Sequence, residues 1–281
     1  QDDLEKLLNI VIVGGGPTGV ELAGALAEQK SFIMPKDYPE LDHNEIDIYL
    51  VQMDGALLQG MSKKSQDDSY KFLEELGVNV KLNTSVESYD GNKAILSNGE
   101  EIVTEKLIWA AGIKPNVPKG LHNLNIERGR IRVNEYLEAE NYNDIYVLGD
   151  LAYMVTEEFP NGHPQVAQVA IQQGRQLSKN LRALSRNKEL KPWKYNDKGS
   201  MATVGRNKAV VDLPSFSFSG FFAWVVWLGV HLFSLIGTKN KVFVFFNWMW
   251  NYLTYDQSLR LILKPVKRIT KKEPETDPKE D

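Results

Sequence analysis

A glycine-rich turn between an apolar strand and a helix is the feature that most constrains this chain. Residues 10–13 are the β-branched run Ile-Val-Ile-Val, and Gly14, Gly16 and Gly19 follow it before an Ala- and Leu-rich helical pattern. In that context the first glycine permits a tight turn, the second admits a pyrophosphate to the backbone, and the third lets helix and strand pack closely. Because unpaired N–H groups and the helix dipole favour anions at a helix N-terminus, the turn predicts a dinucleotide site.

The composition of the chain excludes several classes of site and partner. The 281 residues include no cysteine, which excludes disulfides, iron–sulfur clusters, thiolate zinc sites and redox-active thiol pairs. The four histidines are scattered without metal-ligand spacing, so we expect no metal site. A formal net charge of −4 gives no indication of nucleic-acid binding, and we expect no such partner.

The first part of the chain has the pattern of a Rossmann-like α/β unit with a β insertion. Ser62 or Ser65 is positioned to cap a helix that Gly77 ends. After the first strand we expect a helix over 19–29, an irregular stretch with two prolines over 30–44, a strand over 46–51, a helix over 64–77, a strand over 78–82, an antiparallel meander over 85–103 and a buried strand over 106–112.

The second part of the chain is expected to differ in character along its length. It is predicted to contain an apolar strand over 143–150, a helix over 165–184, strand structure over 201–211, two nearly uncharged aromatic segments over 220–237 and 242–253 with a polar break over 238–241, and a Lys/Arg cluster over 264–272. An acidic, Pro-containing tail follows the cluster, and its composition predicts disorder.

Asp150 is the second informative residue, because it follows an apolar strand and Gly149 directly. A carboxylate there can accept hydrogen bonds from ligand hydroxyls, and it can equally cap a helix or a turn. The ligand interpretation is favoured by the upstream glycine turn and by the Trp-Ala-Ala-Gly sequence at 109–112, where another strand ends. This order of motifs is typical of flavoproteins that bind two dinucleotides.

Six sequence blocks resemble one family, the type II (non-proton-pumping) NADH:quinone oxidoreductases of the respiratory chain. These are flavoproteins similar to the pyridine nucleotide-disulfide oxidoreductases. The blocks occur in the family's order, span most of the chain and are specific only in combination. They are GGGPTGVELAGAL (14–26), WAAGIKPN (109–116), YVLGD (146–150), PQVAQVAIQQG (164–174), KGSMATVG (198–205) and GFFAWVVWLGVHL (220–232).

The resemblance implies an α/β fold, a Rossmann-like two-dinucleotide-binding flavoprotein with a C-terminal membrane-associating helical region. Residues 1–118 would form the NAD(P)H-binding domain, and 119–211 the C-terminal part of the FAD-binding domain, including the helix at the quinone pocket. Residues 212–281 would form the aromatic membrane anchor and the charged tail. Family members begin with a Gly-rich FAD-binding segment that this chain lacks, so we expect a truncated piece that is inactive on its own.

The resemblance also implies roles for individual residues. Gly14, Gly16 and Gly19 would bind the NADH pyrophosphate, and Glu21 would handle protons near the contact between nicotinamide and flavin. Further roles are implied for Ala111 and Gly112 beside the nicotinamide, Gly149 and Asp150 at the flavin ribityl chain, Ala167, Gln168 and Gln172 along the flavin ring and quinone pocket, and Lys198 reaching toward that pocket.

Some of these positions have another interpretation. A carboxylate such as Glu21 is stabilised by the dipole at a helix N-terminus, and Gln168 and Gln172, four residues apart, fit a solvated helix face. Gln52 stands at the end of the second strand, where NAD-specific folds often carry an acid that binds the ribose 2′-OH. We expect NADH if Asp54 occupies that site, and NADPH is possible if it does not.

The aromatic segments are shorter than the roughly 20 apolar residues that a spanning helix needs. Because tryptophan favours the membrane interface and basic clusters attract anionic headgroups, we expect a monotopic anchor that opens a path for quinone. A buried hairpin or dimer interface and a transmembrane hairpin are the alternatives. The expected partners are a membrane quinone, the lipid bilayer surface and a second copy of the chain. Because no export signal is present, peripheral attachment is expected on the cytoplasmic side of the cell membrane.

The expected function is transfer of a hydride from NADH to bound FAD and of electrons onward to a membrane quinone, without proton pumping. One alternative is a non-enzymatic NAD(P)H-binding module at the membrane surface. The other is a soluble flavin-dependent ferredoxin reductase, which the aromatic segments disfavour. Only a flavoprotein is yellow, so the colour of the purified protein separates the binding module from the enzymes.

Overall fold

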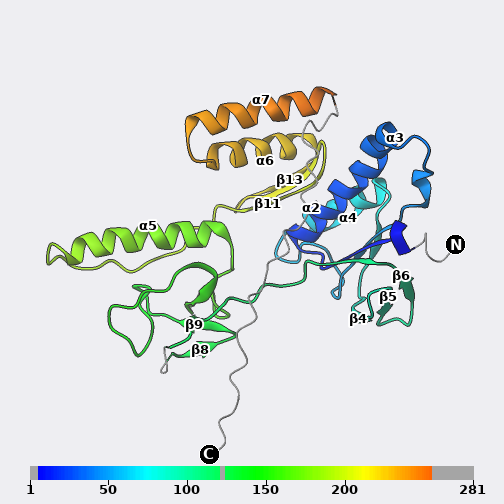
Figure 1. Ribbon diagram of the computed structural model, residues 1–281. Helices are drawn as coiled ribbons and strands as arrows, with labels where there is room; N and C mark the ends of the chain where they lie inside the picture. The colour runs from blue at the N-terminus through cyan, green and yellow to red at the C-terminus, as the bar shows by residue number, and fades with distance from the viewer. Residues whose placement is uncertain (1–5, 121–123, 255–281) are drawn as a thin grey trace, which may run out of the picture. The chain divides into compact units, whose positions relative to one another are not determined.

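The first part of the chain builds an α/β unit around a four-stranded parallel sheet (Figure 1). The computed structural model describes residues 6–120 and 124–254. The elements of this unit are β1 (Ile10–Val13), α2 (Pro17–Glu28), a π-helical turn (Gln29–Ile33), α3 (Met34–Asp37), a 3-10 turn (His43–Glu45), β2 (Ile48–Val51), α4 (Lys63–Glu75), β3 (Asn79–Lys81) and β7 (Lys106–Trp109). The strands lie in the order β3-β2-β1-β7 and all pairs are parallel, which confirms the Rossmann-like arrangement.

A small antiparallel sheet is inserted between β3 and β7, as the meander pattern predicts. It consists of β4 (Val86–Tyr89), β5 (Lys93–Leu96) and β6 (Glu101–Val103). The Asp90 carboxylate fixes the first turn by accepting hydrogen bonds from the backbone N–H groups of Asn92 and Lys93, both at 2.8 Å.

The second part of the chain begins with short strands and continues into a long helix and a hairpin. Its elements are β8 (Ile126–Glu127), β9 (Arg130–Arg132), a 3-10 turn (Gly149–Leu151), β10 (Ala152–Tyr153), α5 (Ala167–Leu184), β11 (Ser200–Gly205), β12 (Lys208–Asp212) and β13 (Ser217–Ser219). The buried face of α5 carries Val169 and Leu177, which pack in a hydrophobic cluster with Ile131 and Trp193. This cluster is separate from the core of the parallel sheet.

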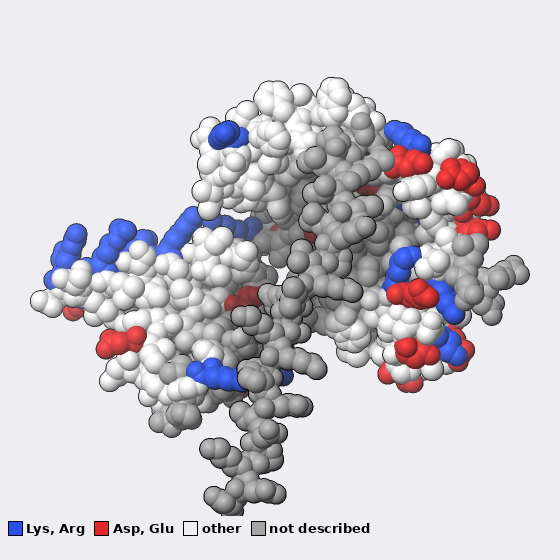
Figure 2. Space-filling model, in the orientation of Figure 1, with Lys and Arg blue, Asp and Glu red and all other residues white. Residues whose placement is uncertain are grey.

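Two apolar helices follow, α6 (Phe221–Ser234) and α7 (Thr238–Thr254). They belong to different compact units, because the chain divides into residues 1–234 and 235–281. Helix α6 contains no Lys, Arg, Asp or Glu, and its surface is white in Figure 2. Within the described residues, no helix has both the length and the apolar character that crossing a membrane requires.

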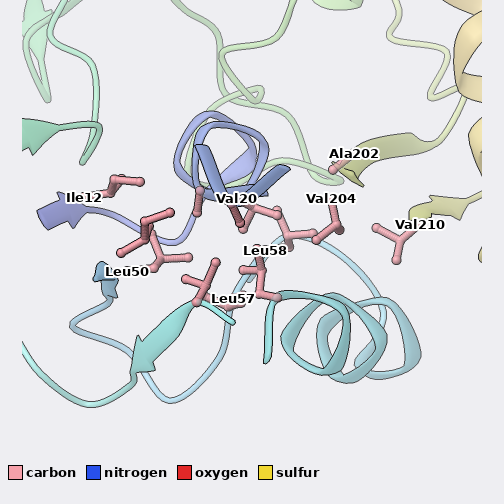
Figure 3. Close-up of a cluster of buried hydrophobic side chains, with 13 residues drawn as sticks. Ile12, Val20, Leu50, Leu57, Leu58, Ala202, Val204 and Val210 are labelled. Atoms are coloured by element: carbon pink, nitrogen blue, oxygen red, sulfur yellow. The ribbon is translucent and has the colours of Figure 1, made fainter. Parts of the chain in front are cut away.

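The β11–β12 hairpin packs against the first core rather than against α5. Figure 3 shows Ala202, Val204 and Val210 of the hairpin at one end of a cluster that continues through Val20 of α2 to Ile12 of β1. The approach is close at Gly24 of α2, where an added Cβ would lie 1.6 Å from the carbonyl oxygen of Val204. The division into 1–118, 119–211 and 212–281 stays a prediction, with β11 and β12 sharing a core with the first of these parts.

Several expected boundaries are wrong near prolines and polar residues. The helix expected over 19–29 begins at Pro17, because proline suits the first turn, where its missing N–H costs no hydrogen bond. The stretch expected to be irregular over 30–44 continues as π-helix and then α3, with Pro35 tolerated in the first turn. The polar break expected over 238–241 is the first turn of α7.

Two expected strands also differ. The strand over 106–112 is not buried: β7 ends at Trp109, lies at an edge of the sheet, and leaves Trp109 63% exposed. The strand expected over 143–150 forms only an isolated bridge between Tyr146 and Glu138, and its last two residues belong to the 3-10 turn. The Lys/Arg cluster over 264–272 and the acidic tail lie outside the described residues.

Candidate functional site

The glycine turn is tightly packed at Gly14 and Gly19 and open at Gly16. Gly14 has a φ of 110°, and an added Cβ would lie 2.8 Å from the backbone of Ala111. An added Cβ on Gly19 would lie 1.9 Å from the carbonyl oxygen of Gly14. At Gly16, by contrast, an added Cβ would meet no atom of the described chain within 4 Å. The turn therefore excludes side chains at Gly14 and Gly19 and leaves the backbone of Gly16 accessible.

Helix α2 presents its N-terminus at this open position. Gly16 is the N-cap residue and Pro17 is the first helical residue, so no cap side chain accepts from the N–H groups of the first turn. The positive end of the helix dipole points to the same region. Both properties suit a phosphate group, as the sequence predicts.

The end of β2 is tied to the glycine turn by one side chain. The Gln52 Oε1 atom accepts a hydrogen bond from the Gly15 N–H at 2.7 Å, and its Nε2 atom donates to the Asp54 carboxylate at 2.8 Å. Asp54 is therefore held beside the turn through Gln52. Lys63 and Lys64 each form an ion pair with an aspartate one turn further along α4.

Glu21 lies half-buried on α2, within two turns of the phosphate-facing end. Its carboxylate accepts a hydrogen bond from the backbone N–H of Thr203 on β11 at 3.3 Å. Burial raises the pKa of Glu21 above its ordinary value, although the Thr203 N–H, His231 and the Trp227 indole each act to lower it. A carboxyl group with a raised pKa, close to a ligand-binding turn, is suited to carrying a proton.

Asp150 is presented on a turn that α5 holds in place. The Gly149 N–H donates to the Gln173 Oε1 atom at 2.6 Å, and the Gln165 Nε2 atom donates to the Asp150 carbonyl oxygen at 3.0 Å. Gly149 has a φ of 63°, and an added Cβ would lie 3.1 Å from the Ala170 Cβ. The backbone of the turn is thus fixed, while the Asp150 side chain is exposed.

Gln168 and Gln172 are half-buried, and both side-chain amides are hydrogen-bonded to the backbone of the segment 196–199. Gln172 donates from Nε2 to the Asn196 carbonyl oxygen at 2.9 Å and accepts from the Asn196 N–H at 3.0 Å. Gln168 donates to the Gly199 carbonyl oxygen at 3.1 Å and accepts from the Lys198 N–H at 3.2 Å. Each amide therefore binds the backbone in the way that a neighbouring strand would.

The same pairing recurs further along the helix. Asn180 donates from Nδ2 to the Lys191 carbonyl oxygen at 2.9 Å and accepts from the Lys191 N–H at 3.1 Å. A row of amides on α5 thus holds the returning segment 191–199 against the helix. Ala167, the first residue of α5, and the Lys198 side chain are both exposed at the end of this row.

The structure brings the predicted residues together in two groups. The first contains the glycine turn, Gln52 and Ala111, with the exposed Gly112 following β7. The second contains Gly149, Asp150 and the α5 amides. Glu21 extends from the first group to the β11 hairpin, and its neighbour Thr203 follows the 198–199 segment that Gln168 binds.

Sequence reasoning missed two residues that build these groups. Gln173 is 1% exposed and fixes the turn before Asp150. Its signal is its position, because it lies four residues from both Val169 and Leu177 on the buried face of α5. Gly24 permits the close packing of α2 on β11, and a row of small residues on one face of α2 was its signal.

Comparisons with known proteins place the chain in a family. The family model described as pyridine nucleotide-disulphide oxidoreductase matches residues 1–174, and the NDH2 C-terminal domain matches residues 198–255. The chain therefore belongs to the pyridine nucleotide-disulphide oxidoreductase family. Residues 198–255 are in addition similar to the NDH2 C-terminal domain.

The chain is 32% identical to the type II NADH:quinone oxidoreductase Ndh of Mycobacterium tuberculosis, over 89% of this chain and 55% of the relative. It is 28% identical to an internal alternative NAD(P)H-ubiquinone oxidoreductase of Arabidopsis thaliana mitochondria, over 90% of this chain and 52% of the relative. A solved structure of NDH2 from Plasmodium falciparum in complex with NADH has the same fold, with a TM-score of 0.79 at 19% identity, covering 90% of this chain and 68% of that chain. The chain spans about half the length of the curated relatives it matches.

Proposed function

We propose that this chain supplies the NADH site, part of the flavin site and the membrane-facing region of a non-pumping NADH:quinone oxidoreductase. The observation that carries the proposal is the glycine turn, where Gly14 and Gly19 admit no side chain and Gly16 is open. An open backbone at a helix N-terminus has the geometry that a dinucleotide pyrophosphate requires. The family relationship supports the same reaction.

The residues present fit both dinucleotides. The α2 N-terminus would hold the NADH pyrophosphate, with Ala111 and Gly112 beside the nicotinamide. Asp150, exposed on a fixed turn, would accept hydrogen bonds from the ribityl hydroxyls of FAD. When bound, the flavin supplies the redox chemistry that passes two electrons from NADH to quinone.

The remaining predicted residues have roles that the geometry supports. Glu21 would hold a proton close to the nicotinamide end of the site, in keeping with its raised pKa. Gln168 and Gln172 would shape the flavin and quinone side by fixing the segment that carries Lys198. Lys198, exposed at the end of this segment, is free to reach a bound quinone.

We infer that NADH is preferred over NADPH. Gln52 holds the Asp54 carboxylate beside the glycine turn, where it would accept from a ribose 2′-OH and repel a 2′-phosphate. The two lysines that could bind a 2′-phosphate, Lys63 and Lys64, are each paired with an aspartate.

We infer that α6 and α7 attach the protein to the lipid surface, on the cytoplasmic side, and that the protein is a homodimer. The support for attachment is the exposed apolar surface: Phe222 and Phe233 of α6 are each 77% exposed, and Phe243 of α7 is 72% exposed. Monomeric soluble proteins rarely expose apolar surface of this extent. Replacing Phe222 and Phe233 with serine should reduce co-sedimentation with vesicles.

The experiment that tests the function uses the full-length polypeptide that contains this chain, bound to vesicles. NADH oxidation is followed with a soluble quinone analogue, with NADPH in place of NADH and with ferredoxin in place of quinone. We expect quinone-dependent oxidation of NADH, slower oxidation of NADPH and no ferredoxin reduction. Binding of NADH without any quinone reduction would favour a binding module and contradict the proposal.

A further inference from the structure

Arg130 of β9 carries its guanidinium group in the interior of the protein, where the residue is 7% exposed. Its Nη1 atom donates a hydrogen bond to the His163 carbonyl oxygen at 3.1 Å, and its Nη2 atom donates to the Ala152 carbonyl oxygen. Within the described residues Arg130 forms no ion pair. Burial lowers the pKa of Arg130, although Asp150 and Tyr153 act to raise it. Because burying a cation without an ion-pair partner costs free energy, its two carbonyl contacts need an explanation.

The two carbonyl groups lie at the two ends of one loop. Ala152 closes the 3-10 turn that presents Asp150, since its N–H donates to the Gly149 carbonyl oxygen. His163 lies at the other end of the loop, in the segment that leads into α5. One guanidinium group therefore joins the end of the Asp150 turn to the entry of the helix.

A further hydrogen bond closes these contacts into a ring. Gln165 follows His163 by two residues, and its Nε2 atom donates to the Asp150 carbonyl oxygen at 3.0 Å. Asp150 in turn precedes Ala152 by two residues. The ring thus runs from Ala152 through Arg130, His163 and Gln165 to Asp150. The Asp150 backbone is held from β9 and from the α5 side, while its side chain is exposed.

The loop between the two ends packs directly on the guanidinium group. Gly162 has a φ of 80°, and an added Cβ would lie 2.6 Å from the Tyr153 ring and 3.4 Å from the Arg130 Nη1 atom. The Arg130 Cζ atom lies 5.5 Å from the centre of the Tyr153 ring. The His163 Nδ1 atom lies 3.0 Å from the Met154 carbonyl oxygen. The path of the loop and the orientation of Arg130 therefore fix each other.

We propose that Arg130 is a positioning residue for flavin binding, which holds the Asp150 turn and the entry of α5 at a fixed spacing. The inference rests on the proposed function, because that function makes FAD the ligand of Asp150. An arginine suits this role, since its planar fork donates to two acceptors from fixed positions. An apolar residue of similar length would fill the same space and leave both carbonyl groups without this donor.

Arg132 provides a matched control on the same strand. Its side chain is 34% exposed and forms ion pairs with Glu127 at 2.6 Å and with Glu140 at 3.2 Å. Removing this arginine takes a positive charge from β9 without touching the ring. Effects that are specific to Arg130 are thereby separated from effects of altering β9.

The test uses the full-length polypeptide that contains this chain. The apoprotein is titrated with FAD to obtain the Kd, and hydrogen exchange is followed by mass spectrometry in peptides that cover 149–154 and 163–167. In R130M we expect the Kd for FAD to rise by about 10- to 100-fold and exchange in both peptides to accelerate. R130K, which keeps a charged donor, should restore the Kd to within about threefold of wild type. R132M should leave the Kd and the exchange unchanged.

A second background distinguishes positioning from a general loss of stability. If Arg130 acts through Asp150, its effect on FAD binding must shrink once the carboxylate is absent. R130M should therefore raise the Kd by less than about twofold in the D150A background. A general loss of stability would instead raise the Kd by the same factor in both backgrounds.

Wild-type FAD affinity in R130M, an undiminished effect in D150A, or an equal loss in R132M would each overturn the proposal. If R130M does not fold, Q165L decides, because it opens the ring at a half-buried residue: unchanged FAD affinity and exchange in Q165L contradict the proposal. A wild-type full-length protein that binds no FAD would refute the proposed function. Hydrogen exchange needs no flavin, so it would still report in that case whether Arg130 holds the turn.

Discussion

Substituting Gly16 and Gly19 one at a time separates ligand binding from folding within a single turn. Gly16 has φ −74° and ψ −178°, which any residue can adopt, and an added Cβ would meet no described atom within 4 Å. Gly16→Ala should therefore change the free energy of unfolding by less than about 0.5 kcal/mol. In Gly19→Ala the Cβ would lie 1.9 Å from the Gly14 carbonyl oxygen, so the helix must move away from the strand.

Gly16→Ala should weaken the binding of NADH, whereas Gly19→Ala should lower the thermal stability. If the Gly16 backbone binds the pyrophosphate, its Cβ occupies the ligand's position and removes a charge-assisted hydrogen bond of about 1.5–3 kcal/mol. At about 1.4 kcal/mol for each factor of ten, the Kd for NADH rises by about 10- to 100-fold. Overpacking in Gly19→Ala costs about 1–3 kcal/mol, which at about 2–4 °C for each kcal/mol lowers the Tm by about 2–12 °C.

Calorimetric titration with NADH and thermal unfolding followed by circular dichroism measure these effects. The reasoning predicts that Gly16→Ala keeps the wild-type Tm and loses affinity, whereas Gly19→Ala has a lowered Tm. Wild-type NADH affinity in Gly16→Ala would refute the assignment of the turn. A wild-type Tm in Gly19→Ala would refute the packing described for α2.

Three further predictions concern residues away from the turn. Burial acts to raise the pKa of Asp212, but hydrogen bonds, the largest from Ser65, outweigh it and lower the pKa. A lowered pKa contributes stability that is fully present above the pKa of the unfolded state and is lost as the pH falls through the pKa of the folded state. In urea titrations, wild type should therefore lose stability relative to Asp212→Asn below about pH 4. Asp54→Asn should raise NADPH affinity about tenfold relative to NADH in competition titrations, since the acid no longer repels the 2′-phosphate. Gln173→Leu should destabilise the fold by about 1–3 kcal/mol and accelerate hydrogen exchange at Gly149, whose N–H loses its acceptor.

The strand–turn–helix at the start of the chain was predictable from the sequence, except for the residue at which its helix begins. Three local signals agree with one another here. The β-branched run predicts a strand, the three glycines at fixed spacing predict a tight turn, and the apolar helical pattern predicts a helix. The meander was predictable for the same reason, because Asp90 and the glycine at 99 mark its turns. These elements carry their own local signals.

The wrong predictions concern properties that depend on distant partners. An apolar pattern over 106–112 indicates a strand, but whether it is buried depends on what covers it, and β7 lies at the edge of the sheet. The run over 143–150 has strand composition, yet it forms only a bridge, because pairing is decided by neighbours and not by the run itself. The extension of α2 into the next helical turns depends on Pro35 falling in a first turn, which its sequence context does not reveal.

The candidate site was predictable only in part. The types and spacing of Gly14 and Gly16 predict a ligand-binding turn, and the position of Asp150 after an apolar run and a glycine predicts a second ligand contact. It does not reveal that Gln172 binds the backbone of Asn196, since a surface amide and an engaged amide have the same sequence pattern. Contacts of this kind between distant segments require the fold.

The most direct test of the central claim is the visible absorption spectrum of the full-length polypeptide that contains this chain. It is recorded without oxygen, first alone, then after NADH, and finally after a quinone analogue. The account predicts a flavin band that bleaches on addition of NADH and returns on addition of quinone. A colourless protein, or a flavin band that NADH leaves unchanged, would contradict it.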